Sequence, residues 1–483
     1  MPQASPPPAQ FDLVALARQE MTAHGFRPDF EADALQQLAA IHVQPDHSLP
    51  DLTGLVWSSI DNDDSHDLDQ IEWAERVATG IRVLVGVADV DSAVAKGTPL
   101  DRHAAREATT VYAGVHNFPM LPERLSTDLT SLNENQDRAA VVIEFVVAAD
   151  GGISAGKVYR ANVRNRAQLA YNAVGAWLES TAGPPPKVGA SADLAAQLHL
   201  QDEAAQALRA ARDRLGALTF DRTEAEPVIT NGRITAITAR QSNRAAHLIE
   251  DFMIAANEVM AQTLRAAGVS NIRRVVKSPE RWARIVELAK QYGEQLPAAP
   301  DSGALNQFLL RRKQADPVHY GDVSLAVLKL MGPGEYVLLR PGDAEAGHFG
   351  LAVEDYTHST APNRRFADLA TQRLLKALPG KPYTDGELAA IAQNCTLKED
   401  AARHVRRNMD KRMAAVALGS RVGQQFQAVV TGATPKGVFV RVLNPPVEGR
   451  LMRGEQGLDV GDVLRVTLLS ADPVRGFIDF GRA

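Results

Sequence analysis

Hydrophobic positions along this chain change their spacing twice, and these changes predict the order of its structural elements. Between residues 51 and 163 short valine-rich runs predominate, and the apolar runs 82–90 and 141–147 are typical of strands buried on both faces. From residue 167 onward apolar residues recur every three or four positions, which predicts helices. Helices are expected over residues 193–215, 244–267, 366–378 and 388–418, with Asp385 as a cap just ahead of the last one. The pattern therefore predicts an α+β protein.

Alternation of apolar and polar residues returns after residue 419. Strands are expected over residues 426–430, 437–442, 463–469 and 476–480. Four or five short strands with glycine-containing turns suit a small closed β-barrel of the OB-fold kind. Residues 420–483 are therefore predicted to form a separate barrel domain.

The N-terminal segment has a different pattern. Residues 1–10 are expected to be a disordered lead-in, and residues 11–50 contain two short amphipathic helices around a turn at residues 25–28. Two interpretations are open here: a small helix-turn-helix-like domain, or a helical clasp packed on the main body. Residues 51–419 then form one large mixed domain.

Composition narrows the class of protein. The chain has 483 residues, of which 45% are hydrophobic and 23% are charged, as in ordinary soluble globular proteins. No apolar run reaches the roughly 18 residues of a membrane-spanning helix, and the N-terminus lacks the features of a secretory signal. The single cysteine, Cys395, fits a reducing cytoplasm. A net charge of −6 argues weakly against an extended surface that binds nucleic acid, but it is compatible with a basic channel.

The densest cluster of charge is the run 61–72, which holds six carboxylates within twelve residues directly after an apolar stretch. Ionised carboxylates so close together repel one another, and a bound cation removes that cost. Oxygen ligands favour a hard ion such as Mg²⁺, Ca²⁺ or Mn²⁺. On an extended chain Asp67 and Asp69 share one face while Leu68 is buried, and Asp61 can converge with them across the turn.

Three interpretations of this cluster can be compared. The spacing is close to that of an EF-hand calcium loop, but His66 stands where that loop requires glycine, and the flanks look like strands. A solvated acidic turn would not need Asp67 and Asp69 on one face. Three carboxylates around divalent metal ions suit phosphodiester hydrolysis, in which metal ions activate water and stabilise the leaving oxygen. The third interpretation is preferred.

Several motifs, in order along the chain, resemble those of the ribonuclease II/ribonuclease R (RNB-domain) family. Asp61…Asp67-Leu68-Asp69 is similar to the family's catalytic aspartate signature. Further matches are the Pro-Met-Leu-Pro turn at 118–122, the central helix at 249–257, the arginine motif at 360–368, and a C-terminal S1 domain. The resemblance covers roughly residues 55–483.

The resemblance implies a function. The family's fold is a large mixed RNB catalytic domain, and its members are processive, hydrolytic 3′→5′ exoribonucleases that degrade single-stranded RNA to nucleoside 5′-monophosphates. Mg²⁺ is the expected metal, with Mn²⁺ as a substitute. A monomeric cytoplasmic protein is expected, with no DNA or membrane partner.

The resemblance also implies residue roles. Asp61, Asp67, Asp69 and Gln70 would hold the metal, with Asp69 the most important for the chemistry, and Arg364 would contact the scissile phosphate. Tyr112 would stack on the terminal bases and set the length of the final product, with Phe220 as its partner. The remaining RNA contacts are expected from Glu250, Arg365 and Phe439.

The sequence departs from the family pattern in three places. Gln70 replaces an aspartate, so the metal site loses one negative charge that Asp63, Asp64 or Glu72 could restore. Ala361 and Asn363 replace a serine and an isoleucine in the arginine motif. The first 50 residues are too short for the two cold-shock barrels of typical members. A catalytically silent RNA-binding regulator is therefore the main rival hypothesis, and an endonuclease or DNA-active nuclease is another.

Overall fold

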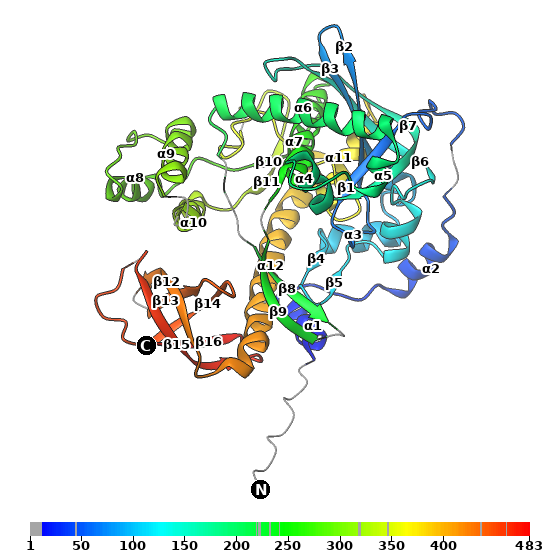
Figure 1. The fold of residues 1–483 in the computed structure, drawn as a ribbon. Coiled ribbons are helices and arrows are strands. Elements are labelled where there is room, and N and C mark those ends of the chain that lie inside the picture. The colour runs from blue at the N-terminus through cyan, green and yellow to red at the C-terminus, as the bar shows by residue number, and fades with distance from the viewer. Residues whose placement is uncertain are drawn as a thin grey trace.

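The computed structural model describes residues 12–483 except 44–45, 219, 221–223, 231–232, 241, 317–319, 345–346, 435–436 and 460. The predicted lead-in 1–10 lies outside the described residues. Two closed five-stranded barrels and a set of helices make up the described structure, which confirms the predicted α+β class (Figure 1).

The first barrel carries the acidic cluster at its rim. Its strand order is β1-β2-β3-β6-β7, and β1 closes the barrel by pairing in parallel with β7, with Asp61 opposite Ala170. The strands are β1 (Trp57–Asp61), β2 (Gln70–Val77), β3 (Gly80–Ala88), β6 (Asp137–Val147) and β7 (Ile153–Ala170). The loop between β1 and β2 therefore starts and ends at the same edge of the barrel.

Helices cover this barrel and join it to the rest of the chain. The main core contains side chains of barrel strands together with Phe252 of α7 and Leu369 of α11. The helices of this body are α3 (Pro99–Glu107), α4 (Tyr171–Leu178), α5 (Pro186–Gly189), α6 (Ala192–Arg214), α7 (Arg244–Ala266) and α11 (Phe366–Lys376). Short 3-10 and π turns lie at η1 (Val90–Ser92), η2 (Arg124–Leu129) and η3 (Gly419–Arg421).

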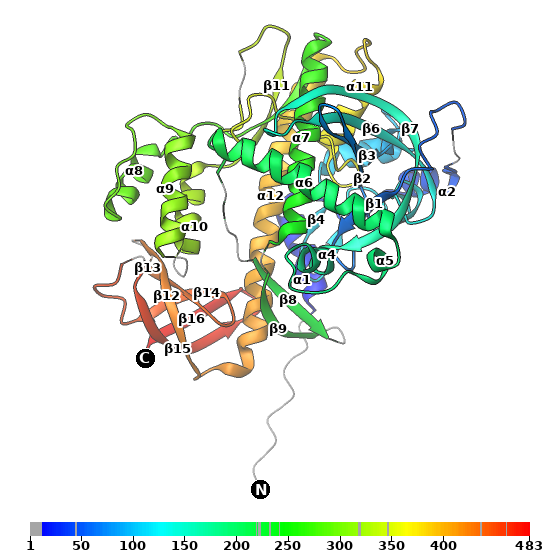
Figure 2. The ribbon, with the colours of Figure 1, turned by 45° about the horizontal axis from the view of Figure 1, so that its top comes forward.

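Three two-stranded sheets connect the larger parts. They are β4 (Val111–Tyr112) with β5 (Asn117–Phe118), β8 (Glu224–Thr230) with β9 (Arg233–Arg240), and β10 (Asn271–Val275) with β11 (Glu335–Leu339). Between β10 and β11 the chain leaves the main body as a lobe of α8 (Trp282–Gln291), α9 (Ser302–Ala315) and α10 (Tyr320–Met331). This lobe has its own core, which includes Trp282, Phe308 and Val327, and it lies above the C-terminal barrel in Figure 2.

Helix α12 (Asp385–Leu418) runs from the main body to the C-terminal barrel (Figure 1). The sequence predicted Asp385 as its cap, and this was wrong by one residue. Thr384 is the N-cap because its backbone is extended, with φ −78° and ψ 161°, whereas Asp385 is already helical. Thr384 Oγ1 accepts from the Glu387 backbone N–H at 3.2 Å, and Glu387 Oε2 accepts from the Thr384 N–H at 2.7 Å, which completes a capping box.

The C-terminal barrel confirms the predicted small closed barrel and fits an OB fold. Its order is β12-β13-β14-β16-β15, with β14 and β16 parallel. The strands are β12 (Gln425–Thr434), β13 (Gly437–Val442), β14 (Val447–Arg453), β15 (Val463–Asp472) and β16 (Phe477–Arg482). The specific strand ranges expected from the sequence omitted β14, where buried Val447, Gly449 and Leu451 alternate with exposed residues directly after two prolines.

The two N-terminal helices pack on different parts of the body. Ala17 and Met21 of α1 (Leu13–Ala23) enter a small core with Val405 and Met409 of α12. Leu38 of α2 (Ala32–Ala40) enters the main core, and α2 packs against α3. Both helices thus pack on the body of the protein, and the predicted helix-turn-helix-like domain stays a prediction. No helix in the described part of the chain is both long and apolar enough to cross a membrane.

Candidate active site

The acidic loop begins where β1 ends. Asp61 Oδ1 accepts hydrogen bonds from the Asn62 backbone N–H at 2.7 Å and from Ser65 Oγ at 2.9 Å, which turns the chain at the barrel rim. Leu68 is 1% exposed, and its N–H donates to Ser131 Oγ at 3.0 Å. The structure thus confirms that Leu68 is buried, and the following Asp69 is buried as well.

Asp69 is the most enclosed of the three predicted metal ligands. Its side chain is 2% exposed, and Oδ1 accepts from the Asn363 backbone N–H at 3.1 Å. Oδ2 lies 3.4 Å from Arg364 Nε and has no hydrogen-bond partner among the described residues. Burial raises the pKa of Asp69 to about 7, with the Asp67 charge adding to the rise and Arg364 opposing it.

Asp67 has a related environment. Burial raises the pKa of its carboxyl, the charge of Arg364 opposes this rise, and the charge of Asp61 adds to it. Asp67 therefore lies close enough to Asp61 and to Asp69 for their charges to interact, and all three carboxylates are near Arg364.

A tight loop before α11 holds Arg364 in place. The Arg364 N–H donates to the Ala361 carbonyl at 3.2 Å, and the Ala361 N–H donates to Asp368 Oδ1 at 2.8 Å. Arg365 pairs with both Asp368 oxygens, at 2.8 and 2.6 Å. Arg365 is thus engaged in fixing the loop, and its predicted RNA contact stays a prediction. The Arg364 side chain is 45% exposed, so a ligand can reach it.

Helix α7 supports this loop from behind. Asn257 Oδ1 accepts from both the backbone N–H of Ser359, at 2.9 Å, and its Oγ, at 2.7 Å. Both residues are buried. Sequence reasoning missed this support, although Asn257 ends the stretch of the central helix that resembles the family.

Tyr112 reaches the same site from strand β4. The segment before β4 is hydrogen bonded to the arginine loop: the Thr110 N–H donates to the Arg364 carbonyl at 2.9 Å, and the Phe366 N–H donates to the Ala108 carbonyl at 2.8 Å. The Arg364 side chain lies near enough to the Tyr112 hydroxyl for its charge to act on that group. Burial raises the pKa of that hydroxyl, the Arg364 charge opposes the rise, and the charges of Asp67 and Asp69 add to it.

Other predicted RNA contacts lie elsewhere. Phe220 packs at the edge of the α8–α10 core, and nothing in the described contacts places it beside Tyr112. Phe439 is half-buried on the outer side of β13, because Val438 and Val440 fill the barrel interior. Gln70 is the first residue of β2 and is buried, 6% exposed.

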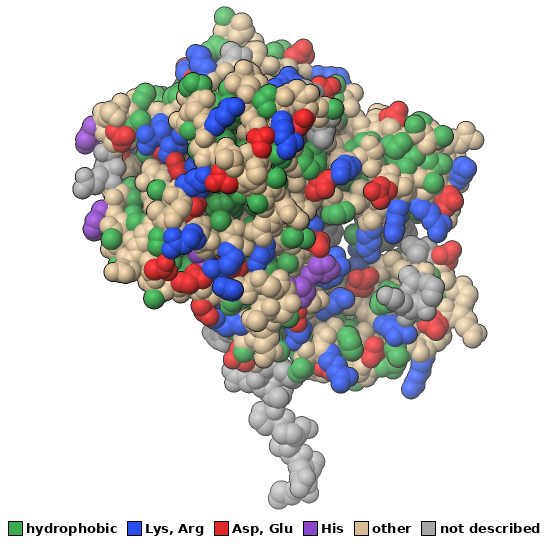
Figure 3. Space-filling model, turned by 180° about the vertical axis from the view of Figure 1, so that it is seen from behind, with side chains coloured by type: hydrophobic (Ala, Val, Ile, Leu, Met, Phe, Trp, Pro, Cys, Tyr) green, Lys and Arg blue, Asp and Glu red, His purple; other side chains and the backbone are tan. Residues whose placement is uncertain are grey.

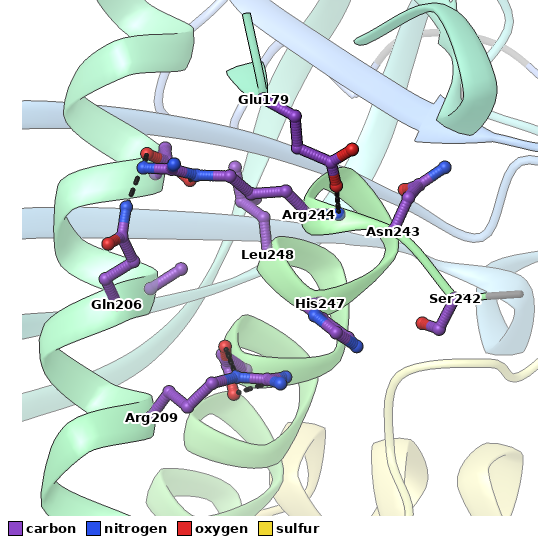
Figure 4. Close-up of a pocket in the computed structure, with 11 residues that line it drawn as sticks. Glu179, Gln206, Arg209, Ser242, Asn243, Arg244, His247 and Leu248 are labelled. Atoms are coloured by element: carbon purple, nitrogen blue, oxygen red, sulfur yellow. Dashed lines mark hydrogen bonds and ion pairs between the residues drawn. The ribbon is translucent and has the colours of Figure 1, made fainter. Parts of the chain in front are cut away.

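Glu250 is exposed on α7 and pairs with Arg209 of α6 at 3.0 Å. Arg209 also lines a cavity of about 310 Å³ between α6 and α7. In Figure 4, Arg209 pairs with α7, while Arg244 reaches back to α6, where Asp202 accepts from it at 2.8 and 2.6 Å. The cations of this cavity are thus paired with its acids, and the cavity lies apart from the aspartate loop.

The donor set can be tested against a divalent metal. Among the described residues no group of three or more His, Cys, Asp or Glu side chains stands ready in a metal-binding arrangement. The chemistry of the donors nevertheless fits a hard cation, because all are oxygens, from three carboxylates and the Gln70 amide, and Asp69 Oδ2 is buried without a hydrogen bond.

Comparison with known proteins identifies the family. A model of the RNB domain matches residues 50–381, and a model of the RNase II-type exonuclease C-terminal S1 domain matches residues 424–483. The chain belongs to the RNB-domain family. Among curated RNB proteins, ribonuclease R of Escherichia coli is 30% identical over 418 residues, covering 83% of this chain and 50% of that protein. Ribonuclease R 1 of Lactococcus lactis is 28% identical over 492 residues, covering 94% of this chain and 59% of that protein.

Two solved structures share the fold. Mycoplasma genitalium RNase R in complex with ribose-methylated single-stranded RNA superposes with a TM-score of 0.88 at 22% identity, covering 98% of this chain and 78% of that chain. Yeast Ssd1, described as a pseudonuclease, superposes with a TM-score of 0.72 at 18% identity, covering 91% of this chain and 56% of that chain. The chain spans about three-fifths of the length of the Lactococcus lactis relative.

Proposed function

We propose that this protein is a 3′→5′ exoribonuclease that hydrolyses single-stranded RNA to nucleoside 5′-monophosphates with Mg²⁺, for which Mn²⁺ can substitute. One observation carries the proposal. Three segments far apart in the sequence bring Asp61, Asp67 and Asp69 together with the exposed guanidinium of Arg364 and the ring of Tyr112. The family relationship supports the same activity.

Each part of the site has a chemical role in this proposal. Asp61, Asp67 and Asp69, with the carbonyl oxygen of Gln70, would hold the metal, which supplies positive charge to the phosphate and lowers the pKa of water. Arg364 has donors free to face a phosphoryl oxygen and the charge that develops there. Tyr112 offers an aromatic face to a terminal base, and stacking of this kind tolerates any base.

Capture of the RNA chain would rest on surfaces outside the aspartate loop. Figure 3 shows Lys and Arg side chains gathered where the α8–α10 lobe faces the C-terminal barrel. Phe439 lies opposite Arg450 on neighbouring strands of that barrel, an aromatic and a cation together on one face. Such pairs suit bases and phosphates, although the whole chain carries a charge of −6. The predicted monomeric state and cytoplasmic location stay predictions.

A second candidate is an RNA-binding regulator without nuclease activity. Gln70 supplies no negative charge to the metal site, and the fold is shared with a protein described as a pseudonuclease. This candidate predicts RNA binding without shortening.

The deciding experiment uses a 5′-labelled single-stranded RNA with and without Mg²⁺. Progressive shortening to a short limit product, abolished by EDTA, supports the exoribonuclease. Full-length RNA that is bound but not shortened supports the regulator. Internal cuts, or degradation of a DNA oligonucleotide of the same sequence, would overturn both.

A further inference from the structure

The two residues of β4 point to opposite sides, as successive residues of a strand do. Tyr112 lies on the side of Arg364, whose charge acts on its hydroxyl. Val111 is 1% exposed and belongs to a small hydrophobic core with Ala113 and Phe118 of the same hairpin. Because Val111 and Tyr112 are neighbours in one strand, a displacement of this core also moves Tyr112.

The N-terminal helix builds one side of that core. Ala17 and Met21 of α1 are 0% and 3% exposed within it, and Phe26, just beyond α1, is 2% exposed. The guanidinium of Arg18 lies 5.9 Å from the centre of the Phe118 ring. Helix α1 thus contacts the Tyr112 hairpin through both apolar packing and a cation–π contact.

Helix α1 and the turn that follows it are also fastened to α12 by hydrogen bonds. Asn408 Nδ2 donates to Glu20 Oε2 at 2.8 Å, and Lys398 Nζ donates to the Gly25 carbonyl at 2.6 Å. In Figure 1, α1 lies beside the lower half of α12, close to β4 and β5. The hairpin itself also contacts α12, because Gly114 at its tip adjoins Met413. Helix α1 is therefore held between a rigid long helix and the hairpin.

We propose that α1 is a positioning element for Tyr112, and that Met21 and Arg18 thereby help to set the length of the limit product. This inference rests on the proposed exoribonuclease function and on the stacking role of Tyr112. When the core under Val111 loosens, Tyr112 no longer holds the terminal base in one place. A short RNA then dissociates before it has been shortened to the length of the normal limit product.

The first test truncates a buried side chain in α1. Met21→Ala is expected to release a longer limit product from 5′-labelled RNA, in the same direction as Tyr112→Ala, while long RNA is still degraded. Leu38→Ala is the matched control, because it truncates a buried residue of α2 in the main core, away from the hairpin. Leu38→Ala is expected to keep the wild-type limit product.

The second test uses the surface residue Arg18, because truncating its side chain leaves no cavity in a hydrophobic core. Arg18 also pairs with Asp29 at 2.8 Å, so Arg18→Ala removes both the ion pair and the contact with Phe118, whereas Asp29→Ala removes the ion pair alone. Arg18→Ala is expected to lengthen the limit product, and Asp29→Ala is not.

A binding measurement separates this inference from catalysis. RNA with 2-aminopurine at its 3′ end is bound in EDTA, and its fluorescence reports stacking. Met21→Ala and Arg18→Ala are expected to weaken the quenching seen with wild type, and Leu38→Ala and Asp29→Ala are not. Wild-type limit product and quenching in both α1 variants would overturn the inference. Quenching without any RNA shortening by the wild type would instead overturn the proposed function and leave the α1 contact supported.

Discussion

Two buried carboxylates near the barrel rim differ in their partners. Asp69 faces Arg364, whereas Glu72 on β2 is 0% exposed and neither of its oxygens has a hydrogen-bond partner among the described residues. Burial raises the pKa of Glu72 well above its ordinary value, and the charge of Asp61 adds to this. Asp69 thus has a cation beside it, whereas burial in the barrel disfavours the charged form of Glu72.

Asp69→Asn is expected to abolish turnover and leave RNA affinity unchanged, because most of the RNA-binding energy would come from surfaces away from the aspartates. Labelled RNA gives the rate, and filter binding in EDTA gives the affinity. Asp193→Asn at the start of α6 is the control, since Asp193 is exposed and lies outside the acidic loop, so its loss should change the rate little. Loss of binding in Asp69→Asn would contradict this division of roles.

Glu72→Gln is expected to change how stability depends on pH. Because the pKa of Glu72 is raised in the folded state, the unfolded chain releases this proton first, and stability is lost as pH rises above about 4.5. Each pKa unit of the rise corresponds to about 1.4 kcal/mol. Urea unfolding at pH 5 and pH 8 should show a smaller loss for Glu72→Gln than for wild type. The exposed Glu123→Gln should keep the wild-type difference.

At the scale of elements, the arginine loop depends on contacts with α7 and β4. Its shape is set by hydrogen bonds that cross between segments: Asn257 holds Ser359, and Thr110 holds the Arg364 carbonyl. The guanidinium is exposed while its backbone is fixed, which suits a group that must meet a phosphate in one orientation.

Asn257→Ala is expected to lower kcat by roughly ten- to a hundredfold with a smaller change in RNA affinity, because a displaced Arg364 no longer meets the reacting phosphate. Single-turnover rates and binding in EDTA measure the two effects. Gln262→Ala, on the exposed side of the same helix, should leave both unchanged. An unchanged kcat in Asn257→Ala would remove α7 from this role.

At the scale of the whole molecule, the C-terminal barrel and α12 share one core. Ala415 and Leu418 of α12 pack with Phe426 and Phe480 of the barrel, so deletion of residues 420–483 would expose apolar surface. The deletion is expected to weaken RNA binding and flatten its salt dependence, and point variants test the same surface without that side effect.

Arg450→Ala is expected to weaken RNA binding and to reduce the slope of log affinity against log salt by about 1, because a phosphate contact is lost. Phe439→Ala should weaken binding with no change in slope, because stacking releases no counterions. Binding titrations at several salt concentrations measure both. Equal salt slopes for Arg450→Ala and wild type would exclude a phosphate contact at this position.

The sequence by itself determined the features that depend on local spacing. The alternation of an extended chain predicted that Leu68 is buried, and the same rule predicted the C-terminal barrel. The motif resemblance added Arg364 and Tyr112 to the site. These predictions needed only neighbouring residues or a short pattern.

Only the tertiary structure decided the features that depend on long-range packing. It separated α1 from α2 onto two cores, placed Phe220 against the α8–α10 lobe, and buried Glu72 without a partner. A periodic pattern tells which face of an element is apolar, but it does not tell which other element covers that face. That choice is made by packing between distant segments, and it gave α1 its place beneath Tyr112.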